Sequence, residues 1–414
     1  MTIIQIISLI ILFFIIGINF KKDTDILSPG KVFLVIWSVV LFITEFKFSL
    51  FQHTWSLFAW ITLLMGIIAF SLGNLIANTV LISNRLYSLK SIRSNFRMKK
   101  FNLNKLLVFL VGLFIIYFSA WAFEIILYGE IPIFSLQPDK ARTEFGVFGI
   151  HLIVNLFPSI LFLCIEYFVL QTTQTKHKIF VWVIFFITFF SYFFLLQRLN
   201  YFFWGTLTFT FLYYSSNSLN LKKIITGLII LIIIMWGINS IRVAQYATQY
   251  LYVISKMKYS SDYASFTGPY MYIVMNMENF ANGVNRLQQH SYGILSGDWF
   301  VALIGIKSWL AEYFNVDYRK FVYSSYNTYP IFWNFYYDFG LIGVVISSLV
   351  LGYLSSLFYF LFRITMRLKY MVMYGIILFG IVMSFFTNIF TSLNFMANIL
   401  LLWWVNSRIM NEQE

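Results

Sequence analysis

The sequence has little charge and almost no cysteine. Only 11% of its 414 residues are Asp, Glu, Lys or Arg, whereas 60% are hydrophobic and the mean hydropathy is +0.78. Because soluble globular proteins carry about a quarter charged residues, the composition excludes a soluble enzyme, a nucleic-acid-binding module and a disordered chain. The single cysteine, Cys164, excludes an internal disulfide, and its apolar surroundings identify it as a packing residue.

Common cofactor and metal motifs are also missing. The sequence contains no phosphate-binding loop of the GxxxxGK[ST] type, no GxGxxG fingerprint, no HExxH and no GxSxG elbow. Its four histidines lie far apart, without the spacing of metal ligands. We therefore predict neither a cofactor nor a catalytic metal.

Long apolar runs dominate the chain and predict its fold. Each is long enough for a transmembrane helix of roughly 20 residues, or nearly so, and separate spans of this kind satisfy their backbone only as helices. We expect an all-α polytopic membrane protein with about 11 transmembrane helices. The runs cover residues 3–19, 32–51, 55–78, 106–128, 147–170, 179–197, 201–216, 224–241, 330–361, 371–389 and 393–407.

The distribution of Lys and Arg predicts the orientation of these helices. Short cytoplasmic loops carry an excess of basic residues, and the segment 79–105 is the most basic short loop of the chain. Placing it inside puts the N-terminus outside, the C-terminus in the cytoplasm and the protein in the cytoplasmic (inner) membrane. Three parts follow: helices 1–8 in residues 1–241, a large outer loop over 242–329, and helices 9–11 in 330–414.

Three arginines are expected at the outer membrane face. Arg142 belongs to the Pro-rich outer loop 129–146, Arg198 interrupts an apolar stretch, and Arg242 ends the eighth span. Guanidinium groups that converge there would bind phosphate or pyrophosphate in bidentate fashion. The alternative is that each arginine only reaches toward lipid headgroups at the end of its helix.

Two further residues are candidates for acid–base chemistry. Asp338 lies at shallow membrane depth in the stretch 329–343, where a carboxylate needs a partner. It could accept a hydrogen bond from a sugar hydroxyl or act as a general base, or it could join an ion pair between helices. His290 is the one histidine of the large outer loop, and it could be a base, an anion ligand or a surface residue.

Three stretches resemble the bacterial oligosaccharide repeat-unit polymerases, the Wzy-type O-antigen or capsule polymerases. They are GEIPIFSLQPDKARTEFG (129–146), QQHSYGILS (288–296) and NTYPIFWNFYYDFGLIGVVISSLVLGYLSSLFY (327–359). The similarity covers the central and C-terminal two-thirds of the chain. It implies the helical fold of membrane glycosyltransferases of the lipid-phosphosugar class. The paired acids found in an early outer loop of some such transferases are missing, which argues against a metal-dependent scheme.

The resemblance also implies an activity and its site residues. A glycan on undecaprenyl pyrophosphate would be transferred to a fresh lipid-linked repeat unit at the outer face, and a chain-length regulator, a flippase and membrane lipid are the expected partners. Asp338 and His290 would be catalytic, and Arg142, Arg198, Arg242 and Arg286 would bind the pyrophosphate. Substrate contacts would come from Glu144, Tyr292, Tyr336 and Tyr337. A lipid-linked oligosaccharide flippase or a ligase-like glycosyltransferase are the alternatives.

Overall fold

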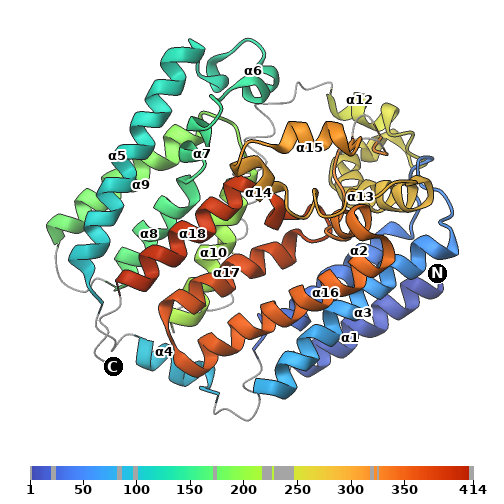
Figure 1. The fold of residues 1–414 in the computed structure, drawn as a ribbon, viewed down its shortest axis with the longest axis horizontal. Coiled ribbons are helices and arrows are strands. Elements are labelled where there is room, and N and C mark those ends of the chain that lie inside the picture. The colour runs from blue at the N-terminus through green and yellow to red at the C-terminus, as the bar shows by residue number, and fades with distance from the viewer. Residues whose placement is uncertain are drawn as a thin grey trace. The chain divides into compact units, whose positions relative to one another are not determined.

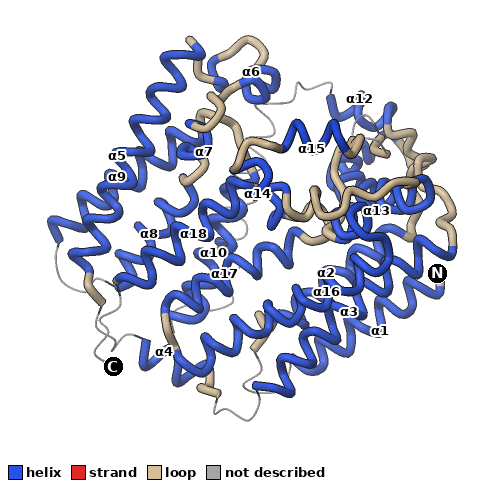
Figure 2. The backbone as a smooth tube through the Cα atoms, viewed as in Figure 1, coloured by secondary structure: helices blue, strands red, loops and turns tan. Residues whose placement is uncertain are grey.

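The computed structural model is built from helices and loops (Figure 2). Over the residues that it describes, no strand forms, and isolated bridges join Ser49 to Met257 and Tyr323 to Tyr326. An all-α fold is therefore confirmed for this part of the chain. The described residues are 2–19, 25–81, 86–96, 101–170, 175–216, 226–227, 247–317, 321–323 and 326–409.

The chain packs as two compact units. Unit 1 comprises residues 1–86, 246–360 and 380–395, and unit 2 comprises 87–245, 361–379 and 396–414. Unit 1 contains α1 (Ile3–Asn19), α2 (Pro29–Thr44), α3 (Leu57–Leu81), α12 (Ala247–Ile254), η2 (Ser261–Phe266), α13 (Thr267–Arg286), α14 (Asp298–Leu303), α15 (Lys307–Tyr313), η3 (Ile389–Thr391) and most of α16 (Phe332–Thr365). Unit 2 contains α4 (Leu89–Phe96), α5 (Leu103–Tyr128), η1 (Pro132–Phe134), α6 (Pro138–Glu144), α7 (Ile150–Val154), α8 (Phe157–Leu170), α9 (Thr175–Phe193), α10 (Leu199–Ser215), and most of α17 (Leu368–Met383) and α18 (Leu393–Arg408).

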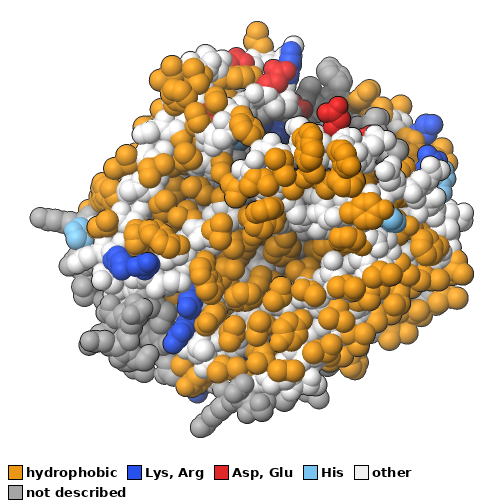
Figure 3. All heavy atoms as spheres, in the orientation of Figure 1, with side chains coloured by type: hydrophobic (Ala, Val, Ile, Leu, Met, Phe, Trp, Pro, Cys, Tyr) orange, Lys and Arg blue, Asp and Glu red, His pale blue; other side chains and the backbone are white. Residues whose placement is uncertain are grey.

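Several helices suit a lipid bilayer. Four helical stretches are long and apolar enough to cross a membrane: Leu57–Leu81, Leu103–Phe134, Ile150–Leu170 and Phe332–Thr365. Shorter apolar helices are Ile3–Ile15, Pro29–Thr44, His177–Phe193 and Leu368–Met383. Hydrophobic side chains also cover much of the visible surface (Figure 3). These features indicate a multi-pass membrane protein. Ten of the eleven expected spans contain a helix, and the other, 224–241, lies outside the described residues except for Thr226 and Gly227.

Close packing of α3 against α16 organises unit 1. A Cβ atom on Gly73 of α3 would overlap the carbonyl oxygen of Leu349, and one on Gly352 of α16 would overlap that of Phe70. Glycine thus lets the two backbones touch, as small residues do between membrane helices. In Figure 1, α1, α2 and α3 run beside α16.

Two expected helices of unit 1 are interrupted. The apolar pattern over 299–314 predicts one helix, but the structure has α14 and α15, because Gly305 between them has φ +77°. The apolar run 330–361 predicts one uninterrupted span, but Phe339 and Gly340 have non-helical dihedral angles within α16. The helical spacing of apolar residues over 270–289 predicts another helix, which is confirmed as α13 and ends at Arg286.

In unit 2, α5 packs against α7, α8 and α9, and α8 packs against α9 and α10. Large rings fill this core: Phe157 of α8 stacks on Tyr192 of α9 with ring centroids 4.1 Å apart. Stacked rings of this kind give unit 2 a closely packed core.

Candidate functional site

A buried carboxylate joins the large loop of unit 1 to α16. Asp338 has no exposed surface. Its Oδ1 accepts hydrogen bonds from the Ser291 hydroxyl and from Leu295 N at 3.1 Å, and its Oδ2 accepts one from Ser296 N at 2.7 Å. Both oxygens are thus occupied by one short segment, 291–296, so Asp338 fixes the shape of that segment.

A neighbouring hydrogen bond, to the backbone of α16, fixes the tautomer of His290. Its Nδ1 lies 3.1 Å from the backbone oxygen of Tyr337, and because a carbonyl oxygen only accepts, Nδ1 must carry the proton. The other ring nitrogen, Nε2, is left to accept a proton. The ring lies over Gly340, where a Cβ would come within 3.3 Å of the ring Cε1. Gly340 has φ +63° and ψ −151°, a conformation essentially limited to glycine.

The other predicted site residues of unit 1 differ in exposure. Arg286 is exposed at the last turn of α13. Tyr292 is also exposed, whereas Tyr336 and Tyr337 are buried. The hydroxyl of Tyr336 donates to the backbone oxygen of Val284 at 3.1 Å. Of the three tyrosines, Tyr292 is therefore the one whose ring can meet a substrate without movement of the core.

Unit 2 also holds a buried acid, Glu124, which is not among the predicted site residues. Glu124, one turn before the end of α5, has no exposed surface. Its Oε2 lies 3.0 Å from Nδ1 of His151, and its Oε1 accepts a hydrogen bond from Val147 N at 2.9 Å. The carboxylate thus joins a partly exposed histidine to the end of the loop 129–146. An acid within an apolar run was the available signal.

A directional chain of hydrogen bonds continues from His151. Nε2 of His151 lies 3.1 Å from Nε2 of Gln197, whose Oε1 accepts a bond from the Tyr192 hydroxyl at 2.5 Å. Because the Gln197 amide nitrogen only donates, His151 Nε2 accepts, and Nδ1 carries the proton toward Glu124. The chain therefore passes through Gln197, the residue before Arg198, and continues to the Tyr192 hydroxyl.

The predicted arginines fall in different parts of the structure. Arg142 and Arg198 both belong to unit 2, Arg286 belongs to unit 1, and Arg242 lies outside the described residues. The loop that carries Arg142 is attached just before Arg198, because Ile133 N donates to the Phe194 backbone oxygen at 3.1 Å.

The charges on α6 are paired within that helix. Arg142 contacts Asp139 at 3.2 Å, and exposed Glu144 lies 4.0 Å from Lys140. Surface ion pairs of this kind contribute little free energy, so an anionic ligand could compete with Asp139 for Arg142, whose side chain is partly exposed. Arg198 immediately precedes α10, where its backbone oxygen accepts bonds from Tyr201 N and Phe202 N.

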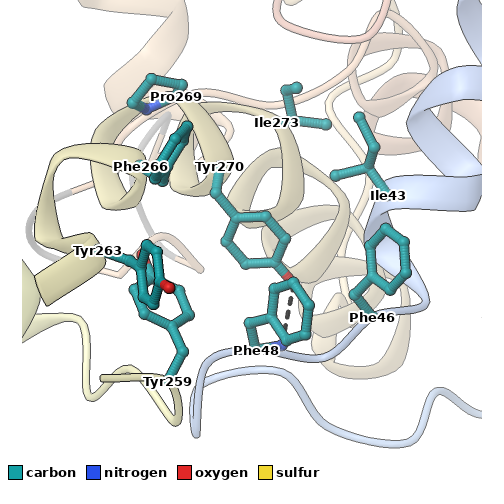
Figure 4. Close-up of a pocket in the computed structure, with 9 residues that line it drawn as sticks. All are labelled: Ile43, Phe46, Phe48, Tyr259, Tyr263, Phe266, Pro269, Tyr270 and Ile273. Carbon is teal, nitrogen blue, oxygen red and sulfur yellow. Dashed lines mark hydrogen bonds between the residues drawn. The ribbon is translucent and has the colours of Figure 1, made fainter. Parts of the chain in front are cut away.

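An aromatic hollow of about 490 Å³ opens in unit 1 at the end of α2. Figure 4 shows rings from Phe48, Tyr259 and Tyr263 around it. The Tyr270 hydroxyl at its edge accepts a hydrogen bond from Phe48 N at 3.0 Å and donates to Gln52 at 2.6 Å. With that hydroxyl already engaged, the hollow suits an apolar group, such as a hydrocarbon chain, better than a sugar.

Another buried acid, Glu278 of α13, contacts the segment between α2 and α3. Its oxygens accept hydrogen bonds from Trp55 Nε1 at 3.0 Å and from His53 N at 3.3 Å. Burial raises the pKa of Glu278 to about 7, and these two hydrogen bonds oppose the rise only in part. Within the described part of the chain, no three His, Cys, Asp or Glu side chains gather to hold a metal ion.

Comparisons with protein-family models, curated proteins and solved structures give no match to this chain.

Proposed function

We propose that this protein polymerises undecaprenyl-pyrophosphate-linked oligosaccharide repeat units into O-antigen or capsular polysaccharide, at the outer face of the cytoplasmic membrane. The proposal starts from the resemblance of its three sequence stretches to Wzy-type polymerases. It requires a multi-pass membrane protein with polar side chains near the helix ends. The four long apolar helices and the two buried acids in α5 and α16 are consistent with that requirement.

The main support for this proposal is a contact between two of these stretches. Two of the three stretches that bear the resemblance, 288–296 and 327–359, lie apart in sequence but are bound to each other through Asp338. Their contact also gives His290 an Nε2 able to accept a proton. A shared structural element is what two motifs of one catalytic site require.

The chemistry needs little beyond positioning and charge stabilisation. The acceptor hydroxyl oxygen forms a bond to the anomeric carbon, while the bond from that carbon to the phosphate oxygen breaks and lipid pyrophosphate leaves. The hydroxyl proton passes to Nε2 of His290. In this scheme Asp338 is a positioning residue, because its oxygens are occupied by the 291–296 segment.

The departing pyrophosphate requires cations, and Arg142, Arg198, Arg242 and Arg286 are the proposed ones. Planar guanidinium groups bind phosphate oxygens in pairs and stabilise developing charge. Tyr292 and Glu144, which are both exposed, are proposed to contact sugars. The aromatic hollow at the end of α2 would take a stretch of polyprenyl chain.

The test is a polymerisation assay with purified protein, defined lipid-linked repeat units and a chelator. We expect the wild type to form a ladder of products on a gel. Arg142→Ala should lower ladder formation at least about 100-fold, the range found when a transition-state charge contact is removed. The matched control is Lys140→Ala, since this cation lies on the same helix and is exposed. It should retain the ladder.

The same variants in cells distinguish the alternatives. Polymerisation predicts that Arg142→Ala leaves single repeat units outside the membrane and no long chains. Repeat units trapped in the cytoplasmic leaflet would instead support a flippase. Transfer of one preformed glycan to a different lipid, without a ladder, would support a ligase.

A further inference from the structure

A buried carboxyl group lies inside unit 2, among residues that the proposed glycosyl transfer does not use. Glu166 of α8 has no exposed surface. The helical stretch around it, Ile150–Leu170, is one of the four that are long and apolar enough to cross a membrane. An ionisable side chain at such a position is costly, so it marks a site that has a partner or a function of its own.

The polar neighbour of Glu166 comes from α18, which lies close to α8 in Figure 1. Asn406 of α18 is also fully buried, and its side chain interacts with that of Glu166. About two turns earlier in both helices, the Ser159 hydroxyl donates to Oδ1 of Asn398 at 2.5 Å. Residues two turns apart lie on the same face of a helix, so both polar contacts belong to one interface between α8 and α18.

The side-chain atoms that meet at Glu166 are acceptors without a donor. Neither carboxyl oxygen of Glu166 has a hydrogen-bond partner among the described residues, and neither has Oδ1 of Asn406. The Asn406 amide nitrogen donates to the backbone oxygen of Leu402 at 3.0 Å. Buried polar atoms are rarely left unsatisfied, because each one costs free energy. One additional donor between the two side chains would satisfy both.

The helices around Glu166 supply neither that donor nor a cation. α5, α9 and α10 pack against α8. Apart from tyrosines, the titratable side chains described on these helices and on α18 are Lys105, Glu124, His177, Lys178 and Arg408. None of them forms a hydrogen bond with the carboxyl oxygens of Glu166. A buried carboxylate without a donor or a cation is far more costly than the neutral acid.

We propose that Glu166 is a proton-binding site inside the apolar stretch Ile150–Leu170. A proton bound to the carboxyl group turns it into a donor, and the O–H group donates to Oδ1 of Asn406. The proton thereby removes the buried charge and supplies the missing donor at the same time. It also links α8 to α18 beside the contact between Ser159 and Asn398. This site does not depend on the proposed polymerase activity.

Infrared difference spectroscopy of the purified full-length protein at neutral pH tests the site. A protonated carboxyl group has a carbonyl band that an ionised carboxylate lacks. We expect this carbonyl band to be present in wild type and lost in Glu166→Gln. Loss of carboxylate bands in its place would show that Glu166 is ionised, and it would overturn the proposal.

The matched control for this spectrum is Glu312→Gln, which makes the same change at an exposed position of α15. Exposed glutamates are ionised at neutral pH, so this variant should lose carboxylate bands and keep the carbonyl band. Loss of the same carbonyl band in both variants would contradict the site, because the band would then not belong to Glu166.

Asn406→Leu tests the partner of the bound proton. It removes the acceptor of the O–H group at similar volume, so the Glu166 carbonyl band should move to higher frequency. Ser159→Ala is the matched control, because it removes the other polar contact of the same interface, and it should leave the band in place. An unmoved band in a folded Asn406→Leu protein would contradict the site. An equal shift in Ser159→Ala would also contradict it, because it would trace the shift to packing between the helices.

The two variants at this interface also guard against a folding artefact. Glutamine reproduces the neutral acid, since its NH₂ group can donate to Oδ1 of Asn406 in place of the O–H group, and we expect Glu166→Gln to melt at the wild-type temperature. If Glu166→Gln does not fold, the position of the carbonyl band in Asn406→Leu decides, because that variant keeps Glu166.

Discussion

Asp338 and Glu124 are both fully buried acids in apolar helices, yet their partners differ in kind. Asp338 accepts two of its three hydrogen bonds from backbone N–H groups. Glu124 accepts one from a backbone N–H group and faces the ring of His151 with both oxygens. The first carboxylate therefore shapes a loop, whereas the second acts on a group that can change its protonation.

The difference arises because a backbone N–H group and an imidazole ring differ in where they can carry a proton. A backbone N–H group can only donate, so the site around Asp338 has one arrangement of protons. An imidazole can present either nitrogen as the donor, so the site around Glu124 has more than one. We infer that the Asp338 region is the rigid one, and that the His151 ring beside Glu124 can change its tautomer. Substitutions of the acids test this contrast.

The largest effect is expected for Asp338→Asn. The new amide keeps one acceptor oxygen, but its NH₂ group would point at Ser296 N or Leu295 N, and two donors would face each other. We expect a loss of about 2–4 kcal/mol of stability. Thermal unfolding measures the loss, and hydrogen exchange should show faster exchange of the Leu295 and Ser296 amides.

The matched control is Asp262→Asn, because Asp262 is an exposed acid in the same unit. Its stability should stay within about 0.5 kcal/mol of wild type. An Asp338→Asn protein that is as stable as this control would show that the 291–296 segment does not depend on the carboxylate.

The sequence predicts most helices because apolar periodicity and run length depend only on local residues. Interruptions were harder to predict: Gly305 and Gly340 lie in apolar runs, and nothing in the sequence alone says that their φ angles are positive. The partners of Asp338 come from a segment more than 40 residues away. Such pairings are set by tertiary packing, which hydropathy does not reveal.

The contact between His151 and Glu124 was equally hard to predict from the sequence. The sequence shows only four histidines far apart, and nothing in it indicates that His151 contacts Glu124, 27 residues before it. A buried acid in an apolar run could have pointed to Glu124. The choice of His151 as its partner required the loop 129–146 to fold back onto α5.

A smaller, pH-dependent effect is expected at Glu278, another buried acid. Its pKa of about 7 in the folded protein lies above its ordinary value, because burial disfavours the charge. Between these two values the native state keeps a proton that the unfolded chain has lost. Stability should therefore fall as the pH rises from about 5 to about 8, by up to roughly 3 kcal/mol. Glu278→Gln should remove this fall.

Melting temperatures of both proteins across that pH range provide the measurement. Glu312→Gln makes the same change of charge at an exposed position of the same unit, and it should retain the wild-type pH dependence. If Glu278→Gln and Glu312→Gln melt with the same pH profile, the dependence arises elsewhere in the molecule.

The smallest change in stability, and the sharpest test of the contrast, is expected for Glu124→Gln. The new amide oxygen can still accept from Val147 N, and its NH₂ group can donate to His151 Nδ1 if the ring proton moves to Nε2 and the Gln197 amide turns over. Because every donor then keeps a partner, the loss should be about 1 kcal/mol or less. Nitrogen-15 spectra of histidine-labelled protein, assigned with a His151→Phe variant, should show the change from Nδ1–H to Nε2–H. An unchanged tautomer together with a loss as large as that of Asp338→Asn would mean that the ring is held as rigidly as a backbone amide, and that the two acids serve the same purpose.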